Sequence, residues 1–159
     1  KVIGTVGSDE KIDIAKKYGC DEVINYSKED FAKKVMELTD GKGVSVVYDG
    51  VGKSTYDKSI ECLKLRGTMV SFGNASGALD PIIVSKSLQP KGIYFVRPAM
   101  NQYFTNSEEI HEAANMLFKQ ISSGNVKIEI YKKYKLEDAV QAHRDLEGRK
   151  ITGPAVIIP

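Results

Sequence analysis

Short, mostly apolar runs alternate with amphipathic helical stretches along this chain of 159 residues, and the alternation predicts an α/β fold with a doubly wound parallel sheet. The runs are rich in β-branched residues and are apolar along their whole length, which is typical of parallel strands buried on both faces. No repeat, low-complexity tract or linker interrupts the sequence. We therefore expect a single domain over residues 1–159.

Five strands are expected in the first two thirds of the chain. Their ranges are Lys1–Val6, Glu22–Asn25, Val44–Asp49, Gly67–Phe72 and Gly92–Val96. Helical patterns separate the first four strands, at Glu10–Tyr18, Lys28–Thr39 and Ser54–Leu63. Ser8 and Ser27 precede the first two helices and are candidates for their N-cap residues, because a serine hydroxyl accepts a hydrogen bond from the first helical turn.

The C-terminal part of the chain predicts a helix followed by a strand–helix–strand segment. The expected elements are a helix at Ser107–Ser122, a strand at Ile128–Tyr131, a helix at Leu136–Leu146 and a closing strand at Ala155–Pro159. A loop containing Pro81 and Pro90 separates this region from the earlier alternation.

Composition excludes several classes of function. With 23 basic and 21 acidic residues well mixed, the formal charge of +2 predicts no nucleic-acid partner. No apolar run approaches the roughly 20 residues that cross a bilayer, so we expect a cytoplasmic protein with no membrane partner. Cys20 and Cys62 form no CxxC motif, which argues against a zinc or redox site. His111 and His143 have no nucleophile or carboxylate at a recognisable spacing, so no catalytic residue and no metal ligand is predicted.

Ligands of doubly wound folds bind beyond the carboxyl ends of the strands. In this sequence those ends are Gly7-Ser8, Tyr26, the run Asp49–Gly52 and the run Phe72–Asn74. Glycines at strand ends allow a flat ring or a phosphate to approach the backbone, although an ordinary tight turn explains either Gly50 or Gly52 equally well. Asn74 is likewise open to interpretation as a turn former.

Three motifs carry a resemblance to a known family. The runs TDGKGVSVVYDGVG, LKLRGTMVSFGNASG and YKLEDAVQAHRDLEGRKITGPAVIIP, in this order and spacing, resemble the nucleotide-binding half of the medium-chain dehydrogenase/reductase superfamily. The resemblance is to its zeta-crystallin-like quinone oxidoreductases and spans essentially the whole chain. One departure is Gly153-Pro154, where many relatives carry a Gly-Lys pair.

The resemblance implies that the cofactor is NADPH. A carboxylate at the end of the second strand of a Rossmann unit bonds the adenosine ribose and repels a 2′-phosphate, and here that place holds Gly7 followed by Ser8. Lys11 lies in the first turn of the next helix, where the helix dipole also attracts an anion. In the resembling enzymes a matching Lys, Tyr and Arg surround the 2′-phosphate, and Lys11, Tyr26 and Arg149 occupy those places.

Each of these three residues also has a simpler interpretation. Lys11 is compatible with a solvated helix charge, Tyr26 with a half-buried packing aromatic, and Arg149 with a charge at a helix C-terminus. Asp9, an acid close to the expected phosphate, is interpreted as a first-turn residue that favours the helix dipole and points away from the ribose.

The resemblance further places backbone contacts to the nicotinamide half of the cofactor at Phe72, Gly73 and Asn74. Gly50 and Val51, at the end of the preceding strand, are also expected to contact the cofactor. The implied reaction is hydride transfer from NADPH to a quinone, without zinc or a covalent nucleophile. Two alternatives remain open: reduction of an activated alkene such as an enone, and a non-catalytic, crystallin-like nucleotide-binding module.

Two expectations concern parts that the chain does not contain. In the strand order 3-2-1-4-5-6, the first strand and its glycine-rich turn are missing, and that strand would lie between Lys1–Val6 and Val44–Asp49. We therefore expect the chain alone to be inactive. In the resembling enzymes the strand matching Ile93–Val96 pairs with its symmetry mate, which predicts a homodimer.

Overall fold

The computed structural model of the protein describes residues 1–148 and 150–159. Its contacts divide the chain into two compact units, the first at Lys1–Tyr103 and the second at Phe104–Pro159.

The first unit contains the predicted alternation of strands and helices. Its strands are β1 (Ile3–Val6), β2 (Glu22–Asn25), β3 (Val44–Asp49), β4 (Leu63–Ser71) and β5 (Tyr94–Val96). Its helices are α1 (Glu10–Lys17), α2 (Phe31–Leu38), α3 (Tyr56–Cys62), the short α4 (Val84–Ser87), the 3₁₀ turn η1 (Gln89–Lys91) and α5 (Met100–Tyr103). The last three were not predicted, because elements of three or four residues are too short to show a period.

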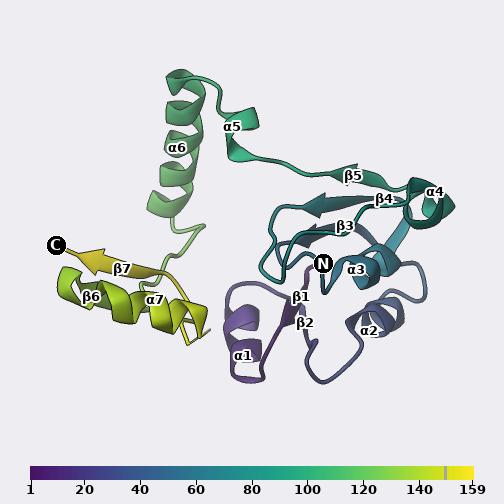
Figure 1. Ribbon diagram of the computed structural model, residues 1–159, viewed down its shortest axis with the longest axis horizontal. Coiled ribbons are helices and arrows are strands. Elements are labelled where there is room, and N and C mark those ends of the chain that lie inside the picture. Colours follow the sequence, from purple (N-terminus) through teal and green to yellow (C-terminus); the bar gives the residue numbers. More distant parts are fainter. Residues whose placement is uncertain (149) are drawn as a thin grey trace. The chain divides into compact units, whose positions relative to one another are not determined.

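All strand pairs of this unit are parallel, as predicted. β1 pairs with β2, and β3, β4 and β5 run side by side in that order (Figure 1). β1 and β3 do not belong to the same hydrogen-bonded sheet. The unit is therefore an α/β structure whose parallel strands form two sheets.

Helix α2 packs against strands of both sheets. Phe31, Ala32 and Val35 on its buried face share a cluster with Ile24 of β2 and Cys62 of α3. Partly buried side chains from β1 and β3 pack onto the same cluster, namely Ile3, Val44 and Val47. Burying one face of an amphipathic helix in this way supplies most of its stability, because eight residues are too few for a helix in isolation.

The predicted N-caps of the first two helices are wrong. Asp30, not Ser27, caps α2, because its carboxylate accepts hydrogen bonds from the backbone N–H groups of Ala32 at 3.0 Å and Lys33 at 3.3 Å. Ser8 does not cap α1, where the N-cap position is occupied by Asp9. Asp30 has an extended backbone, from which its side chain reaches the first turn of the helix.

The second unit contains a long helix and a strand–helix–strand segment. Its elements are α6 (Ser107–Ser122), β6 (Lys132–Lys135), the 3₁₀ turn η2 (Leu136–Asp138), α7 (Ala139–Glu147) and β7 (Ala155–Ile158). β6 and β7 are parallel. Helix α6 has the predicted bounds and is capped by Asn106, whose side chain accepts a hydrogen bond from the backbone N–H of Glu109 at 3.0 Å.

The strand predicted at Ile128–Tyr131 is wrong, because the strand that pairs with β7 begins four residues later, at Lys132. Ile128, Ile130 and Tyr131 are about half exposed, whereas Tyr134 in β6 is 5% exposed. Tyr134 is the one buried side chain of β6, and its hydroxyl donates to the carboxylate of Asp145 on α7 at 2.8 Å. A tertiary hydrogen bond therefore outweighs the stronger strand propensity of the apolar run.

Among the described residues, no helix combines the length and the apolar character needed to cross a membrane.

Candidate functional site

The ends of β1 and β2 bring Gly7 against Tyr26. The Tyr26 backbone N–H donates to the carbonyl of Val6 at 3.0 Å, and the Ser27 hydroxyl donates to the carbonyl of Gly7 at 2.8 Å. A Cβ atom added to Gly7 would lie only 2.9 Å from the Tyr26 hydroxyl. Gly7 therefore has a steric reason to lack a side chain, and the Tyr26 hydroxyl lies directly beside it.

Lys11 lies in the first turn of α1, four residues beyond Gly7. Its backbone N–H donates to the carbonyl of Ser8 at 3.2 Å, which closes the turn between β1 and α1. Its side chain is partly buried, and no carboxylate pairs with its ammonium group within the described part of the chain. We call Gly7, Ser8, Lys11 and Tyr26 the phosphate pocket, after the ligand group that the sequence predicts there. Arg149, the remaining predicted member, lies outside the described residues.

The carboxylate of Asp9 is bonded to residues at the end of β2. It accepts hydrogen bonds from the side-chain amide of Asn25, at 2.7 Å, and from the Lys28 ammonium group. The Lys28 hydrogen bond, with that of Asn25 second, lowers the pKa of Asp9. Asp9 is therefore ionised at neutral pH and is paired with a lysine.

A buried carboxylate organises the glycine turn after β3. Asp49 is 5% exposed and accepts hydrogen bonds from the backbone N–H groups of Val51 at 2.8 Å and Gly52 at 2.9 Å. The hydroxyls of Thr55 and Ser59 on the following segment also donate to it, each at 2.8 Å. Four donors thus satisfy this carboxylate, as burial requires. The Asp at the strand end was visible in the sequence, but its hydroxyl donors were missed.

The turn after β3 interlocks with the turn after β4. The carbonyl of Val51 accepts hydrogen bonds from the Ser76 backbone N–H at 2.7 Å and hydroxyl at 2.8 Å. A Cβ atom on Gly73 would lie 2.2 Å from the carbonyl oxygen of Gly50, and one on Gly52 would lie 2.8 Å from that of Gly77. Gly52 also has φ +90°, which glycine adopts without strain. The glycines are therefore required where the two turns meet.

The remaining predicted residues of this region lie on the same pair of turns. A Cβ atom on Gly50 would lie 3.0 Å from the Phe72 ring, so that ring covers Gly50, and Phe72 is 56% exposed. The carbonyl of Asn74 accepts a hydrogen bond from the Gly77 backbone N–H at 3.0 Å, which is a turn-forming role. The structure thus brings together Gly50, Val51, Phe72, Gly73 and Asn74.

Arg97, just after β5, was missed by sequence reasoning. Its guanidinium group donates to the carbonyls of Ser71 at 2.7 Å and Gly73 at 3.3 Å. It therefore ties the exit of β5 to the end of β4. The only signal in the sequence was a charged residue directly after an apolar strand, which is too common to assign a role.

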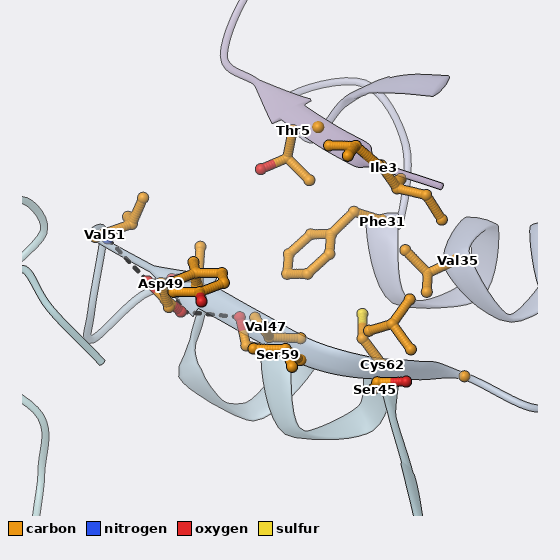
Figure 2. A pocket seen from close by; sticks show the side chains of 18 of the residues that line it. Ile3, Thr5, Phe31, Val35, Ser45, Val47, Asp49, Val51, Ser59 and Cys62 are labelled. Carbon is orange, nitrogen blue, oxygen red and sulfur yellow. Dashed lines mark hydrogen bonds between the residues drawn. The ribbon is translucent and has the colours of Figure 1, made fainter. Parts of the chain in front are cut away.

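A cleft of about 790 Å³ separates β1 from β3. Ile3 and Thr5 line one side of it, and Val47 and Asp49 line the other, with the Phe31 ring projecting between them (Figure 2). Cys62 of α3 also lines the cleft, and burial raises the pKa of its thiol to about 12, so the thiol stays protonated. The cleft lies between the two sheets, where the sequence predicts that a strand is missing.

The chemistry of the site is that of binding and orientation. The region after β1 and β2 offers the Lys11 ammonium group and the Tyr26 hydroxyl. The region after β3 and β4 offers a rigid pair of glycine turns. Within the described residues, no group of three or more His, Cys, Asp or Glu side chains could hold a metal ion. These residues do not fit a zinc site, and no step is assigned to zinc.

Comparison with known proteins identifies the family. Residues 1–119 match the family model described as zinc-binding dehydrogenase. Quinone oxidoreductase 1 of Escherichia coli strain K12 is 45% identical over 100% of this chain and 49% of its own length. The 2-haloacrylate reductase of a Burkholderia species is 44% identical over 99% of this chain and 48% of its own length. The chain therefore spans about half the length of these curated relatives.

Solved structures agree with the predicted fold. The structure of Escherichia coli quinone oxidoreductase complexed with NADPH has a TM-score of 0.94 and 45% identity, over 100% of this chain and 49% of that chain. The quinone oxidoreductase of Pseudomonas syringae pv. Tomato DC3000 has the same TM-score and 43% identity, over the same shares. The resemblance to quinone oxidoreductases of the medium-chain dehydrogenase/reductase superfamily is thereby confirmed, and the chain belongs to the zinc-binding dehydrogenase family.

Proposed function

We propose that this chain is the NADPH-binding part of a quinone oxidoreductase. The observation that carries the proposal is the phosphate pocket, in which a glycine stands beside the Tyr26 hydroxyl and Lys11 has no carboxylate partner among the described residues. A neutral strand end followed by a cation favours a 2′-phosphate over a free ribose hydroxyl. Similarity to an oxidoreductase whose structure contains NADPH supports the same cofactor.

The chain's own residues bind and orient the cofactor. Lys11 and Tyr26 would hold the 2′-phosphate of the adenosine half, with Arg149 as a further predicted contact. The glycine turns, fixed by Asp49 and Arg97, would present backbone to the nicotinamide half. When bound, NADPH supplies the hydride, and the protein contributes position and electrostatics. No catalytic residue is assigned to this chain.

A second candidate function is reduction of an activated alkene. Its support is the 44% identity to a 2-haloacrylate reductase, which nearly equals the identity to quinone oxidoreductase 1. The two candidates share the cofactor and differ only in the acceptor. A non-catalytic nucleotide-binding module is the third possibility.

Turnover by the complete protein distinguishes these functions. NADPH oxidation is followed by absorbance with a series of quinones and with enones and 2-haloacrylate. We expect oxidation with quinones and little with alkenes. Preference for the alkenes would support the second function, and no turnover with any acceptor would favour the binding module.

We further propose that β5 joins two copies of the protein into a homodimer. β5 forms the edge of its sheet, and Tyr94 and Val96 are exposed on it, at 65% and 36%. Ile93, directly before the strand, is buried in a cluster with Leu63 and Met69 of β4. An exposed apolar edge without a blunting lysine favours pairing with another strand.

The single-domain organisation and the cytoplasmic location remain predictions from the sequence.

A further inference from the structure

Asp9 is an acid next to a pocket that is proposed to bind an anion. It lies two residues after Gly7 and two before Lys11, within the turn that the phosphate pocket uses. Like charges at short range repel each other. A free carboxylate at this position would therefore oppose selection of NADPH.

The structure turns this carboxylate toward the end of β2. Asn25 is 4% exposed, and its side-chain oxygen accepts a hydrogen bond from the Ser27 backbone N–H at 3.0 Å. Because that bond fixes which side of the amide is oxygen, the amide nitrogen faces Asp9 and donates to it at 2.7 Å. The carboxylate makes no hydrogen bond to the first turn of α1. Asn25 thus aims Asp9 away from the helix end that carries Lys11.

Lys28 supplies the compensating charge. Its ammonium group contacts the second carboxylate oxygen of Asp9, and both side chains are more than half exposed. An ion pair this exposed contributes little to the stability of the fold. The positive charge of Lys28 nevertheless offsets the negative charge of Asp9 beside the phosphate pocket.

We propose that Lys28 and Asn25 tether Asp9, holding its carboxylate away from the phosphate pocket, and that Lys28 is thereby a positioning residue for NADPH selectivity. The inference rests on the proposed function. Lys28 does not itself contact the cofactor. It acts through Asp9, so its effect on NADPH binding should depend on whether Asp9 is a carboxylate.

A double-mutant cycle in the complete protein tests this dependence. Dissociation constants for NADPH and NADH are measured by calorimetry for wild type, Lys28→Met, Asp9→Asn and the double variant. We expect Lys28→Met to weaken NADPH binding about fivefold, the scale of one exposed charge interaction, and NADH binding less than twofold. In the Asp9→Asn background the same substitution should change NADPH binding less than twofold.

Two further variants serve as controls. Lys34→Met removes a lysine from another exposed pair, with Glu37 at 2.9 Å on α2, and should leave both constants unchanged. Lys11→Ala reports on the pocket itself. Circular dichroism verifies that each variant is folded.

The outcomes separate the inference from the function on which it rests. An equal NADPH loss on removing Lys28 in both backgrounds would show that Lys28 attracts the phosphate directly, and the tether would be wrong. If Lys28→Met has no effect while Lys11→Ala still loses NADPH selectively, the tether fails and the proposed pocket stands. If neither variant alters the preference for NADPH, the pocket itself is wrong and the tether falls with it.

Discussion

Under the proposed function, Lys11 is the residue on which cofactor selectivity should depend most directly. If its ammonium group bonds the 2′-phosphate, Lys11→Ala should weaken NADPH binding by about 1.5–3 kcal/mol, the usual contribution of a charged hydrogen bond. NADH, which lacks that phosphate, should bind almost as before. Titration calorimetry at low and high salt measures both constants, and salt should reduce the preference for NADPH. Equal losses for the two cofactors would assign Lys11 to the shared diphosphate or to structure.

Gly73 is a residue whose missing side chain keeps the glycine turns together. In Gly73→Ala the new Cβ would overlap the carbonyl of Gly50, so one turn must move. We expect a loss of about 1–3 kcal/mol in unfolding free energy, as for other overpacked sites, together with weaker NADPH binding. Urea denaturation measures the first quantity. Ser76→Ala, which removes hydrogen bonds without adding volume, should have the smaller effect on stability, and the reverse order would contradict this account.

Asp145 makes the packing of α7 against β6 dependent on pH. Hydrogen bonds from Tyr134, and next from Lys132 and Gln141, lower its pKa from 3.8 to about 2. A depressed folded-state pKa stabilises the protein above pH 3.8, and that contribution is lost as the pH falls toward 2. Wild type should therefore lose more stability than Asp145→Asn between pH 4 and pH 2, as measured by denaturant unfolding. Glu137→Gln, at an exposed pair with Lys135, is the matched control and should behave like wild type.

Strand β5 is the element that would form the dimer interface. Tyr94→Pro places in β5 a residue that cannot donate a backbone hydrogen bond to a neighbouring strand, so it should produce monomers. Val96→Lys, which adds a charge to the edge without altering the backbone, should do the same. Sedimentation of the complete protein determines the oligomeric state. A dimer that persists in both variants would remove β5 from the interface.

At the scale of the whole molecule, the parallel strands of the first unit form two separate sheets. β1 and β3 belong to different sheets and flank a cleft of about 790 Å³. Paired strands of one sheet, in contrast, normally lie about 4.8 Å apart. We propose that a strand from the part of the protein that this chain does not contain fills the cleft, and that its glycine-rich turn supplies the backbone donors for the pyrophosphate. The chain alone should then bind NADPH weakly, through the phosphate pocket, without turnover.

Complementation tests this expectation. The chain is assayed for NADPH affinity and quinone reduction by itself and after addition of the separately expressed N-terminal portion. Activity restored only on mixing would support a strand that enters the cleft, and hydrogen exchange at β1 and β3 should slow at the same time. NADPH oxidation by the chain alone would overturn the account.

Local patterns in the sequence determined most of the elements. β2, β3 and α6 have the bounds predicted from apolar runs and helical periodicity, because those signals arise from each segment's own burial. The glycines after β3 and β4 were also recognisable in the sequence as candidate site residues, since only glycine allows another backbone segment to come this close.

Only the tertiary structure decided the features that depend on residues far apart in the chain. β6 forms at Lys132–Lys135 because Tyr134 meets Asp145 on α7, and no property of the neighbouring apolar run reveals that contact. Asp9 is turned aside by Asn25, which lies 16 residues away. Arg97 likewise reaches the turn after β4 across more than 20 residues. The free energy of such contacts depends on which side chains the fold brings within hydrogen-bond distance, and a periodic pattern carries no record of those partners.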